Sequence, residues 1–414
     1  MVIKVALVGL SARAATSWAS RAHLPYLLSD QGRKQYQIVA LLNSSVDAAR
    51  EAIKHYGLPS DTTAAYGDPD ALATDIVGGQ IEVNLVSTAT RVDVHYPIVQ
   101  PILKAVAAKR SSAPKDFGVF VEWPLGANLK EVAELTDLVK DGNIKSIVGL
   151  QGRVSPVYLA VRDLIASGRI GRVLSSDARA NGGSVSRSAL SESLGYFLDR
   201  SVGGNVITIG LGHTIDSIQA AIGELSGTQS QAQLQRPKID LRKPGEKEGE
   251  WIVTKTVTSD VPDLITVLGK LTPKQGSGKE YFSDGTATFQ IRFVRGEPFP
   301  GEPGYVLTVA GEKGELRLVS PGGPSIQAFG GGGNNEGPTS IKLSVHDYES
   351  GKVEEVPWQW QDWQSTLEPV PARNIGQLYE AYAAGREADY ATFADAQARH
   401  EQIEGWLNEF EKRE

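Results

Sequence analysis

The first 150 residues alternate short β-branched runs with longer helical stretches, and this alternation constrains the fold more than any other feature of the chain. It is typical of βαβ units built around a parallel sheet. The runs that we assign to strands are IKVALVG, QIVALLN, EVNLVST, FGVFVEW and SIVGLQG. Helical patterns lie between them, at about 16–28, 46–56, 95–109 and 129–140. The sequence therefore predicts an α/β domain with a parallel sheet over residues 1–150.

From about Gln151 the pattern changes. A helix over 155–171 is followed by longer runs of alternating residues, such as IRFVRG, GYVLTVAG and GELRLVS. Such runs are typical of an antiparallel sheet with one face packed on helices. The chain has 414 residues, more than the ~250–300 at which one core usually stops growing. We therefore expect a second domain over 151–414, whose apolar residues at helical spacing near the C-terminus predict closing helices that could pack back on the first domain.

The composition argues against several classes of function. The net charge of −7 gives no general attraction to nucleic acid or to an anionic membrane. There is no cysteine, and the six histidines are scattered without metal-ligand spacing, so we expect no metal site. No run reaches the ~20 apolar residues of a membrane span, and no signal peptide is evident. We expect a cytoplasmic protein.

The loop after the first predicted strand reads GLSARAATSW, at the place where a dinucleotide-binding fold has GxGxxG. Only Gly9 matches, while Ser11 and Ala14 occupy the next two glycine positions. These small residues still allow fairly close approach to a pyrophosphate, but without the freedom of glycine at positive φ. An ordinary βα turn is the competing interpretation. The candidate cofactor contacts here are Gly9, Leu10, Ser11 and Ala12.

The end of the second predicted strand bears on the choice of dinucleotide. Asn43, Ser44 and Ser45 stand where an NAD-specific fold places an acidic residue for the ribose 2′-hydroxyl. An acid would repel a 2′-phosphate, whereas Asn and Ser can donate hydrogen bonds to one. The sequence thus favours NADP over NAD. Further candidates for ribose or phosphate contact, with helix capping as the competing role, are Ser87, Thr88 and His95.

Four stretches resemble the Gfo/Idh/MocA family, named for glucose–fructose oxidoreductase and inositol dehydrogenase: VGLSARAATSWASRAHLPYL, FVEWPLGANL, LQGRVSPVYLAVRDLIASGRIG and GHTIDSIQ. The likeness spans both predicted domains in the same order. It implies an N-terminal Rossmann domain and a C-terminal α+β domain with a large open, mostly antiparallel sheet. Within the family the likeness is strongest to the subgroup of yeast galactose-regulon repressors, which are non-catalytic and bind NADP.

The family resemblance assigns roles to Glu122 and Trp123. Enzymes of the family have Glu-Lys-Pro where this chain has Glu-Trp-Pro. The proline turns the chain beneath the nicotinamide, and a cis peptide would suit that turn. The lysine helps to hold or accept the proton as hydride leaves. Trp123 can stack and donate one hydrogen bond, but it carries no proton at a useful pKa. We take Glu122 and Trp123 as cofactor contacts.

The second family signature is a DxxxH arrangement. His213 matches the catalytic histidine, but Ile209 stands four residues earlier, where the family has an aspartate. A histidine near neutrality can still act as a lone general acid or base. The competing interpretation is a buried histidine that bonds Asp216 or the backbone.

Three further residues complete the candidate site. Gln151 and Arg153 follow the last predicted strand and should face the cleft above the cofactor. Arg153 could hold a substrate anion or a carbonyl oxygen, or it could form an inter-domain salt bridge. Tyr196 is a substitute proton donor, although its phenol would need an activating neighbour. Its competing role is packing.

Three functions remain open at this stage. The first is an NADP-dependent oxidoreductase acting on a sugar-like or secondary-metabolite hydroxyl, carbonyl or imine. The second is a non-catalytic NADP-binding regulator with a transcription factor as partner, which the residues Trp123 and Ile209 favour. The third is elimination or cyclisation in the same cleft. We favour the enzyme, with a small-molecule substrate, and expect a homodimer formed through the open sheet face.

Overall fold

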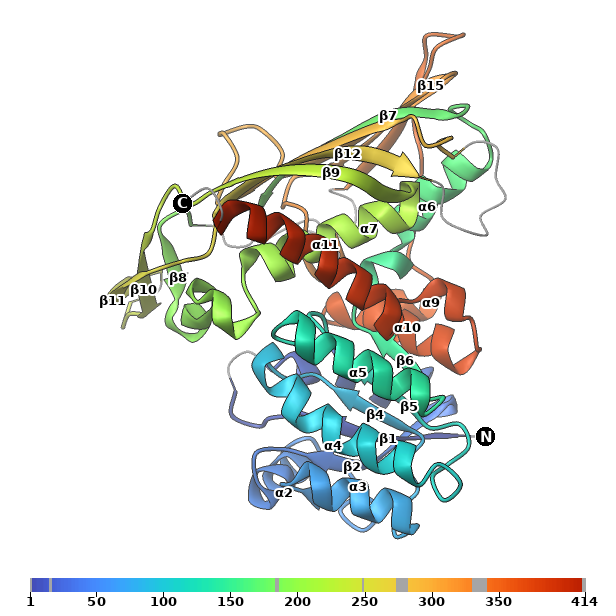
Figure 1. The fold of residues 1–414 in the computed structure, drawn as a ribbon, viewed down its shortest axis with the longest axis vertical. Coiled ribbons are helices and arrows are strands. Elements are labelled where there is room, and N and C mark those ends of the chain that lie inside the picture. The colour runs from blue at the N-terminus through green and yellow to red at the C-terminus, as the bar shows by residue number, and fades with distance from the viewer. Residues whose placement is uncertain are drawn as a thin grey trace. The chain divides into compact units, whose positions relative to one another are not determined.

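The computed structural model describes residues 2–14, 17–182, 186–247, 249–272, 282–329 and 341–411. The chain divides into two compact units (Figure 1). Unit 1 comprises Met1–Gln151 and Gln361–His400, and unit 2 comprises Gly152–Trp360 and Glu401–Glu414. That residues 1–150 and 151–414 are separate folding domains stays a prediction.

The sheet of unit 1 has six parallel strands in the order β3-β2-β1-β4-β5-β6. Their bounds are β1 (Ile3–Val8), β2 (Tyr36–Leu42), β3 (Ala64–Tyr66), β4 (Leu85–Thr88), β5 (Gly118–Val121) and β6 (Lys145–Val148). The strand order reverses between β1 and β4. In sheets of this kind, ligands bind beside such a reversal, at the carboxyl ends of the strands. The predicted Rossmann architecture is confirmed.

Helices connect these strands, and local capping explains where several of them begin. Ser45 Oγ accepts the N–H of Ala48 at the start of α2, and Asn128 Oδ1 accepts the N–H of Glu131 at the start of α5. The helices are η1 (Ala19–His23, a π-helix), α1 (Leu24–Leu28), α2 (Val46–His55), α3 (Pro69–Gly78), α4 (His95–Ala108) and α5 (Leu129–Asp141). Short 3₁₀ turns lie at Gly32–Lys34, Val92–Val94 and Gln151–Val154.

The C-terminal part of unit 1 lies far along the chain from its sheet. Val148 N donates to Ala391 O at 2.8 Å, and Phe393 N donates to Ser146 Oγ at 3.1 Å, so the segment before the last helix is bonded to β6. The segment contains α9 (Asp362–Ser365), α10 (Pro371–Ala383), a 3₁₀ turn (Glu387–Asp389) and the start of α11 (Phe393–Glu411). Helix α10 packs on η1 and α1.

Unit 2 is built on an eight-stranded sheet in the order β17-β16-β15-β14-β7-β13-β12-β9. Only β7 and β13 pair in parallel; every other neighbouring pair in this order is antiparallel. A three-stranded sheet, β11-β10-β8, completes the strands of the described residues. Their bounds are β7 (Val173–Gly182), β8 (Ala189–Ser191), β9 (Glu224–Gln233), β10 (Lys238–Pro244), β11 (Trp251–Thr258), β12 (Leu264–Thr272), β13 (Thr288–Arg295), β14 (Tyr305–Gly311), β15 (Gly314–Ser320), β16 (Lys342–Asp347) and β17 (Val353–Glu355).

One face of the large sheet is covered by helices. Burial alternates along β12, where Ile265, Val267 and Leu271 are fully buried and Leu268 is exposed. Helix α7 runs under β9 and β12 (Figure 1). The helices of unit 2 are α6 (Pro156–Ala166), η5 (Glu192–Leu198), η6 (Arg200–Val202), η7 (Val206–Leu211, a π-helix), α7 (Gly212–Ile222) and α8 (Ile326–Phe329), together with the end of α11. The large open, mostly antiparallel sheet expected from the family resemblance is confirmed.

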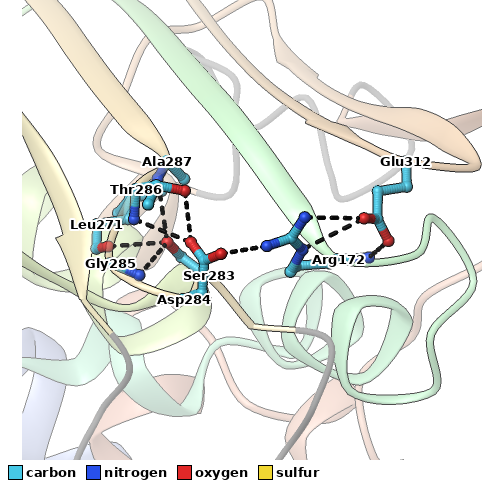
Figure 2. A network of polar contacts seen from close by, with 8 residues as sticks. All are labelled: Arg172, Leu271, Ser283, Asp284, Gly285, Thr286, Ala287 and Glu312. Atoms are coloured by element: carbon cyan, nitrogen blue, oxygen red, sulfur yellow. Dashed lines mark hydrogen bonds and ion pairs between the residues drawn. The ribbon is translucent and has the colours of Figure 1, made fainter.

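Arg172 ties together three segments at one end of this sheet, as Figure 2 shows. Its guanidinium bonds Glu312, in the turn between β14 and β15, and Asp284, which precedes β13. Asp284 in turn accepts the N–H of Thr286, and Ser283 Oγ donates to Leu271 O at 2.9 Å. Hydrogen bonds from Thr286, with a smaller contribution from the charge of Arg172, hold the pKa of the Asp284 carboxyl below its usual value, and hydrogen bonds from Arg172 do the same for Glu312. Because these groups are exposed, the network orders the sheet end more than it stabilises the fold.

Two sequence-based expectations concern features that would be visible in the fold. Within the described ranges, no helix is both long and apolar enough to cross a membrane. The same part of the chain contains no group of three or more His, Cys, Asp or Glu side chains that could hold a metal ion.

Candidate functional site

A pocket of about 470 Å³ opens at the carboxyl edge of the unit 1 sheet, beside the strand-order reversal. Its walls come from the ends of β1 and β2, the turn after β4, and the first residues of α2, α3 and α4. Four of the predicted cofactor contacts line it together: Gly9, Ser11, Asn43 and Ser44. Open α/β sheets usually bind their ligands at this position, outside the carboxyl ends of the strands.

Gly9 brings the backbone close to the neighbouring strand. Its φ is 87°, a left-handed value that favours glycine. A Cβ on Gly9 would lie 2.6 Å from Thr90 Cγ2 and 2.9 Å from Ala89 O. The N–H of Gly9 donates to Leu42 O at 3.0 Å. The chain therefore passes tightly between the ends of β2 and β4, with no side chain between the backbone and a ligand.

The rest of the loop is held without a second glycine. Ser11 Oγ accepts the N–H groups of Arg13 and Ala14 at 3.2 and 3.1 Å, and Ser11 O accepts the hydroxyl of Tyr56 at 2.9 Å. Leu10 is buried, whereas Ala12 is half-exposed beyond the pocket wall. Hydrogen bonds from within the loop and from the chain just after α2 thus hold the loop in shape without further glycines.

Asn43 lines the pocket, and its amide nitrogen is bonded to the loop and to α2. Its Nδ2 donates to Leu10 O at 2.8 Å and to Ala48 O at 3.2 Å. Its Oδ1 is buried and has no partner among the described residues. A ribose hydroxyl can donate to that oxygen, but Asn43 has no N–H left for a 2′-phosphate. The donors that we expected at the end of β2 are reduced to the exposed Ser44 and to Ser45, whose Oγ already accepts from Ala48 N at 3.1 Å.

Two threonine hydroxyls at the end of β4 also have no partner in the described part of the chain. Thr88 is fully buried, and Thr90 lines the pocket. A buried hydroxyl without a hydrogen bond is costly, so such groups are usually completed by a water or a ligand. With Gly9 and Asn43 Oδ1, Thr90 makes this edge fit the ribose and phosphate groups of a dinucleotide.

Ser87 and Glu122 belong to a buried network instead of the pocket. Ser87 Oγ lies 2.7 Å from the hydroxyl of Tyr379, which lies 2.8 Å from His23 Nδ1. His23 Nε2 lies 2.8 Å from Glu122 Oε1. The network joins β4 and the end of β5 to η1 and α10. Sequence reasoning missed His23 and Tyr379, and no signal in the sequence connects residues that are 356 positions apart.

Two histidines fix the segment that carries Trp123. His95, a predicted cofactor contact, lies with its ring nitrogens 2.9 Å from Pro124 O and 3.0 Å from Thr90 O, and burial lowers its pKa. The Trp123 ring is 4.4 Å from that of His400, whose Nε2 accepts Leu125 N–H. The Trp123–Pro124 peptide is cis. The position of the family's lysine is therefore filled by a packed indole, which is only 5% exposed.

The proton-transfer candidates lie in unit 2. His213 and Ile209 are both half-buried and lie about one helical turn apart. Arg153 is committed to Asp216 within the same unit, through Nε to Oδ2 at 2.9 Å and Nη2 to Oδ1 at 2.7 Å. Both side chains are almost fully buried. This pairing leaves Arg153 few donors for a substrate and favours a positioning role at the start of α7.

Two candidates remain, Tyr196 and Gln151, and Gln151 belongs to the same 3₁₀ turn as Arg153 (Gln151–Val154). Tyr196 is in η5, half-buried, with its ring 4.9 Å from that of Phe197, which packs on the small core at Leu190 and Ile239. Gln151 follows β6 in unit 1 and is 1% exposed. Its Oε1 has no partner in the part of the chain that the structure describes. Gln151 is thus one more unsatisfied acceptor that follows the carboxyl end of a strand.

Comparison with known proteins relates the chain to both regulators and enzymes. Residues 156–320 match the family model of the Gal80p C-terminal domain. The chain is 26% identical over 326 residues to the galactose/lactose metabolism regulatory protein GAL80 of Saccharomyces cerevisiae, which covers 78% of this chain and 67% of that protein. It is also 26% identical over 322 residues to the dehydrogenase aclE of Aspergillus oryzae, which covers 77% of each chain.

Solved structures show the same fold over the full length. A super-repressor mutant of Gal80p from Saccharomyces cerevisiae aligns with a TM-score of 0.80 at 22% identity, over 100% of this chain and 97% of that chain. Levoglucosan dehydrogenase, solved with NADH and levoglucosan, aligns with a TM-score of 0.69 at 18% identity, over 100% and 98%. The resemblance to Gfo/Idh/MocA-type oxidoreductases and to Gal80 is confirmed, and within unit 2 it includes the match of residues 156–320 to the Gal80p C-terminal domain model.

Proposed function

We propose that this chain, which shares its fold with Gal80 and with Gfo/Idh/MocA-type oxidoreductases, is an NADP-dependent oxidoreductase. Its substrate would be a sugar-like or secondary-metabolite compound that carries a hydroxyl, carbonyl or imine group. The observation that carries the proposal is the pocket at the edge of the unit 1 sheet. At Gly9 no side chain separates the backbone from a ligand, and the side-chain oxygens of Asn43 and Thr90 have no hydrogen-bond partner among the described residues.

The residues that would hold the dinucleotide all belong to unit 1. Gly9 and Ser11 allow the backbone to approach the pyrophosphate, and Asn43 Oδ1 accepts from a ribose hydroxyl. No acidic side chain follows β2 directly, so a 2′-phosphate is not repelled there. When bound, the nicotinamide supplies the hydride acceptor or donor.

His213 is the group that we assign to proton transfer. Imidazole exchanges protons near neutral pH, and His213 is half-buried near the start of α7. Ile209 provides no carboxylate one turn earlier to orient the ring or raise its basicity. We expect Arg153 to position α7 through Asp216, with Tyr196 as the second candidate for the proton.

The proposal is tested by following nicotinamide absorbance with a panel of sugars, polyols, carbonyls and imines. The His213→Asn variant should lower turnover by roughly 10²–10⁴-fold without changing cofactor affinity, the usual size of a lost acid–base contribution. His346→Asn is the control, because His346 is a half-buried histidine on β16 of the same unit. Full activity of His213→Asn on a confirmed substrate would move the proton-transfer role to Tyr196.

A non-catalytic NADP-binding regulator is the second candidate function. It is favoured by the packed indole of Trp123 where the enzymes have lysine, and by Ile209 where they have aspartate. A transcription factor would then be the partner. This choice of partner is supported by the similarity to a protein named as a metabolism regulatory protein. A wild-type protein that binds NADPH but turns over no member of the panel would support this function over the enzyme.

We also propose a homodimer formed through the uncovered face of the eight-stranded sheet. Leu174 and Leu268 are 46% and 48% exposed on β7 and β12 of that sheet. A second copy that covers this face would bury both side chains. Light scattering should give about twice the mass of one chain, and a monomer at micromolar concentration would contradict the proposal.

A further inference from the structure

We propose that Arg13 binds the 2′-phosphate of NADP(H) and thereby determines the choice between NADP and NAD. This inference rests on the proposed function, because it requires a dinucleotide in the pocket of unit 1. It also names a charged donor to act beside the hydroxyl of Ser44, since the amide N–H groups of Asn43 are both in use.

Arg13 lies at the rim of the pocket. It follows the pocket residue Ser11 by two positions, and its Nε donates to Glu51 Oε1 at 2.7 Å. Glu51 comes three residues after Ala48 on α2, and Ala48 lines the pocket. Residues three apart share one face of a helix. The ion pair therefore places the guanidinium beside the face of α2 that carries Ala48, at the turn that follows this pocket residue.

The guanidinium has donors to offer. Glu51 engages Nε, and neither Nη group of Arg13 has a partner among the described residues. The side chain is 80% exposed, so a ligand can reach it. An arginine fork matches the oxygens of a phosphate and can bond two of them at once. Glu51 would stay in place as the group that orients the fork.

The loop backbone holds the base of the Arg13 side chain. Ser11 Oγ accepts the Arg13 N–H at 3.2 Å, and the Tyr56 hydroxyl donates to Ser11 O at 2.9 Å. The loop is thus bonded near both ends of α2, through Asn43 to Ala48 and through Ser11 to Tyr56.

Arg50 provides a matched control. Like Arg13, it is exposed, but it lies on α2. It makes one weak ion pair, with 3.5 Å between Arg50 Nη1 and Asp47 Oδ1. It lines a different surface hollow, together with Lys54 and Thr63. Since Arg50 and Glu51 are consecutive on a helix, they point in directions about 100° apart. A general effect of surface charge would appear in Arg50→Gln as much as in Arg13→Gln.

The test is calorimetric titration of the full chain with NADPH and with NADH. We expect wild type to bind NADPH more tightly. Arg13→Gln should weaken NADPH binding by about 10–100-fold, the size of a lost charged hydrogen bond, and change NADH binding less than about twofold. Arg50→Gln should bind both cofactors as wild type does. Unchanged NADH binding also reports that the Arg13→Gln variant is folded.

The other outcomes separate this inference from the proposed function. Unchanged NADPH affinity in Arg13→Gln, equal losses of both cofactors, or equal affinities in wild type would each overturn the role of Arg13 and leave dinucleotide binding intact. A wild-type protein that binds neither cofactor would refute the proposed function, and the inference would fall with it.

Discussion

At the scale of single residues, chemistry at the sheet edge depends on which atoms are already engaged. Asn43 was chosen from sequence as a donor to phosphate, yet both of its N–H atoms bond backbone carbonyls and only its oxygen remains. Arg153 was chosen as an anion ligand, yet Asp216 holds two of its nitrogens. The residue type determines which hydrogen bonds a side chain can form, and the bonds it already makes in the fold determine which donors and acceptors remain for a ligand.

His400 gives a prediction for pH. Burial, with a smaller contribution from the charge of His95, lowers the pKa of His400 to about 3, whereas an unfolded histidine titrates near 6.5. Between these values the unfolded state binds a proton that the folded state does not. Stability that is present above about pH 6.5 is therefore lost as the pH falls toward 3, by about 2 kcal/mol at pH 5.

His400→Gln should reduce this loss, because glutamine can still accept the Leu125 N–H but does not titrate. Denaturant unfolding at about pH 7 and pH 5 would measure the change in free energy of unfolding for both proteins. The histidine His95 should contribute with the same sign to both, because burial lowers its pKa as well. His55→Gln, at an exposed position on α2, is the control. Parallel pH dependence in wild type and His400→Gln would contradict the assignment.

At the scale of elements, the hydroxyl of Tyr379 fastens α10 to the sheet. It bonds His23 Nδ1 and Ser87 Oγ, and all three residues are fully buried. Tyr379→Phe would leave buried polar groups short of a partner, which costs about 1–3 kcal/mol. We expect a loss of that size in the free energy of unfolding from denaturant titration.

Tyr382 on the same helix is the matched control. Its hydroxyl is buried and has no partner among the residues that the structure describes. Removing it in Tyr382→Phe should be neutral or stabilising, because an unsatisfied polar group is removed from the interior. Equal destabilisation by the two variants would show that the Tyr379 network does not hold the helix.

Periodicity and β-branched composition predicted the long elements of unit 1 but not the short ones. The five expected strands and the helices near 46–56, 95–109 and 129–140 are present. Strand β3 was missed because its three residues carry no periodic signal, and helix α3 was missed although it is as long as α2. The expected helix at 16–28 contains the π-helix η1 and α1, a change of helix type that apolar spacing does not reveal.

At the scale of the whole molecule, the alternation of elements predicted a parallel sheet, and the pocket of unit 1 opens at the carboxyl edge of that sheet. Gly9, Ser11, Asn43 and Ser44 do share one pocket. The inward turn of Ser87 and Glu122 could not be inferred, because their partners His23 and Tyr379 come from distant segments. Contacts between such segments are set by tertiary packing, which a single sequence does not encode locally.

The central claim is that unit 1 binds a dinucleotide in the pocket beside the strand-order reversal. The most direct test is a crystal structure of the protein with NADPH. We expect the adenosine half in the pocket, a ribose hydroxyl on Asn43 Oδ1, the pyrophosphate against Gly9 and the 2′-phosphate at Arg13. An empty pocket at saturating NADPH, or a dinucleotide bound elsewhere on the chain, would contradict the claim.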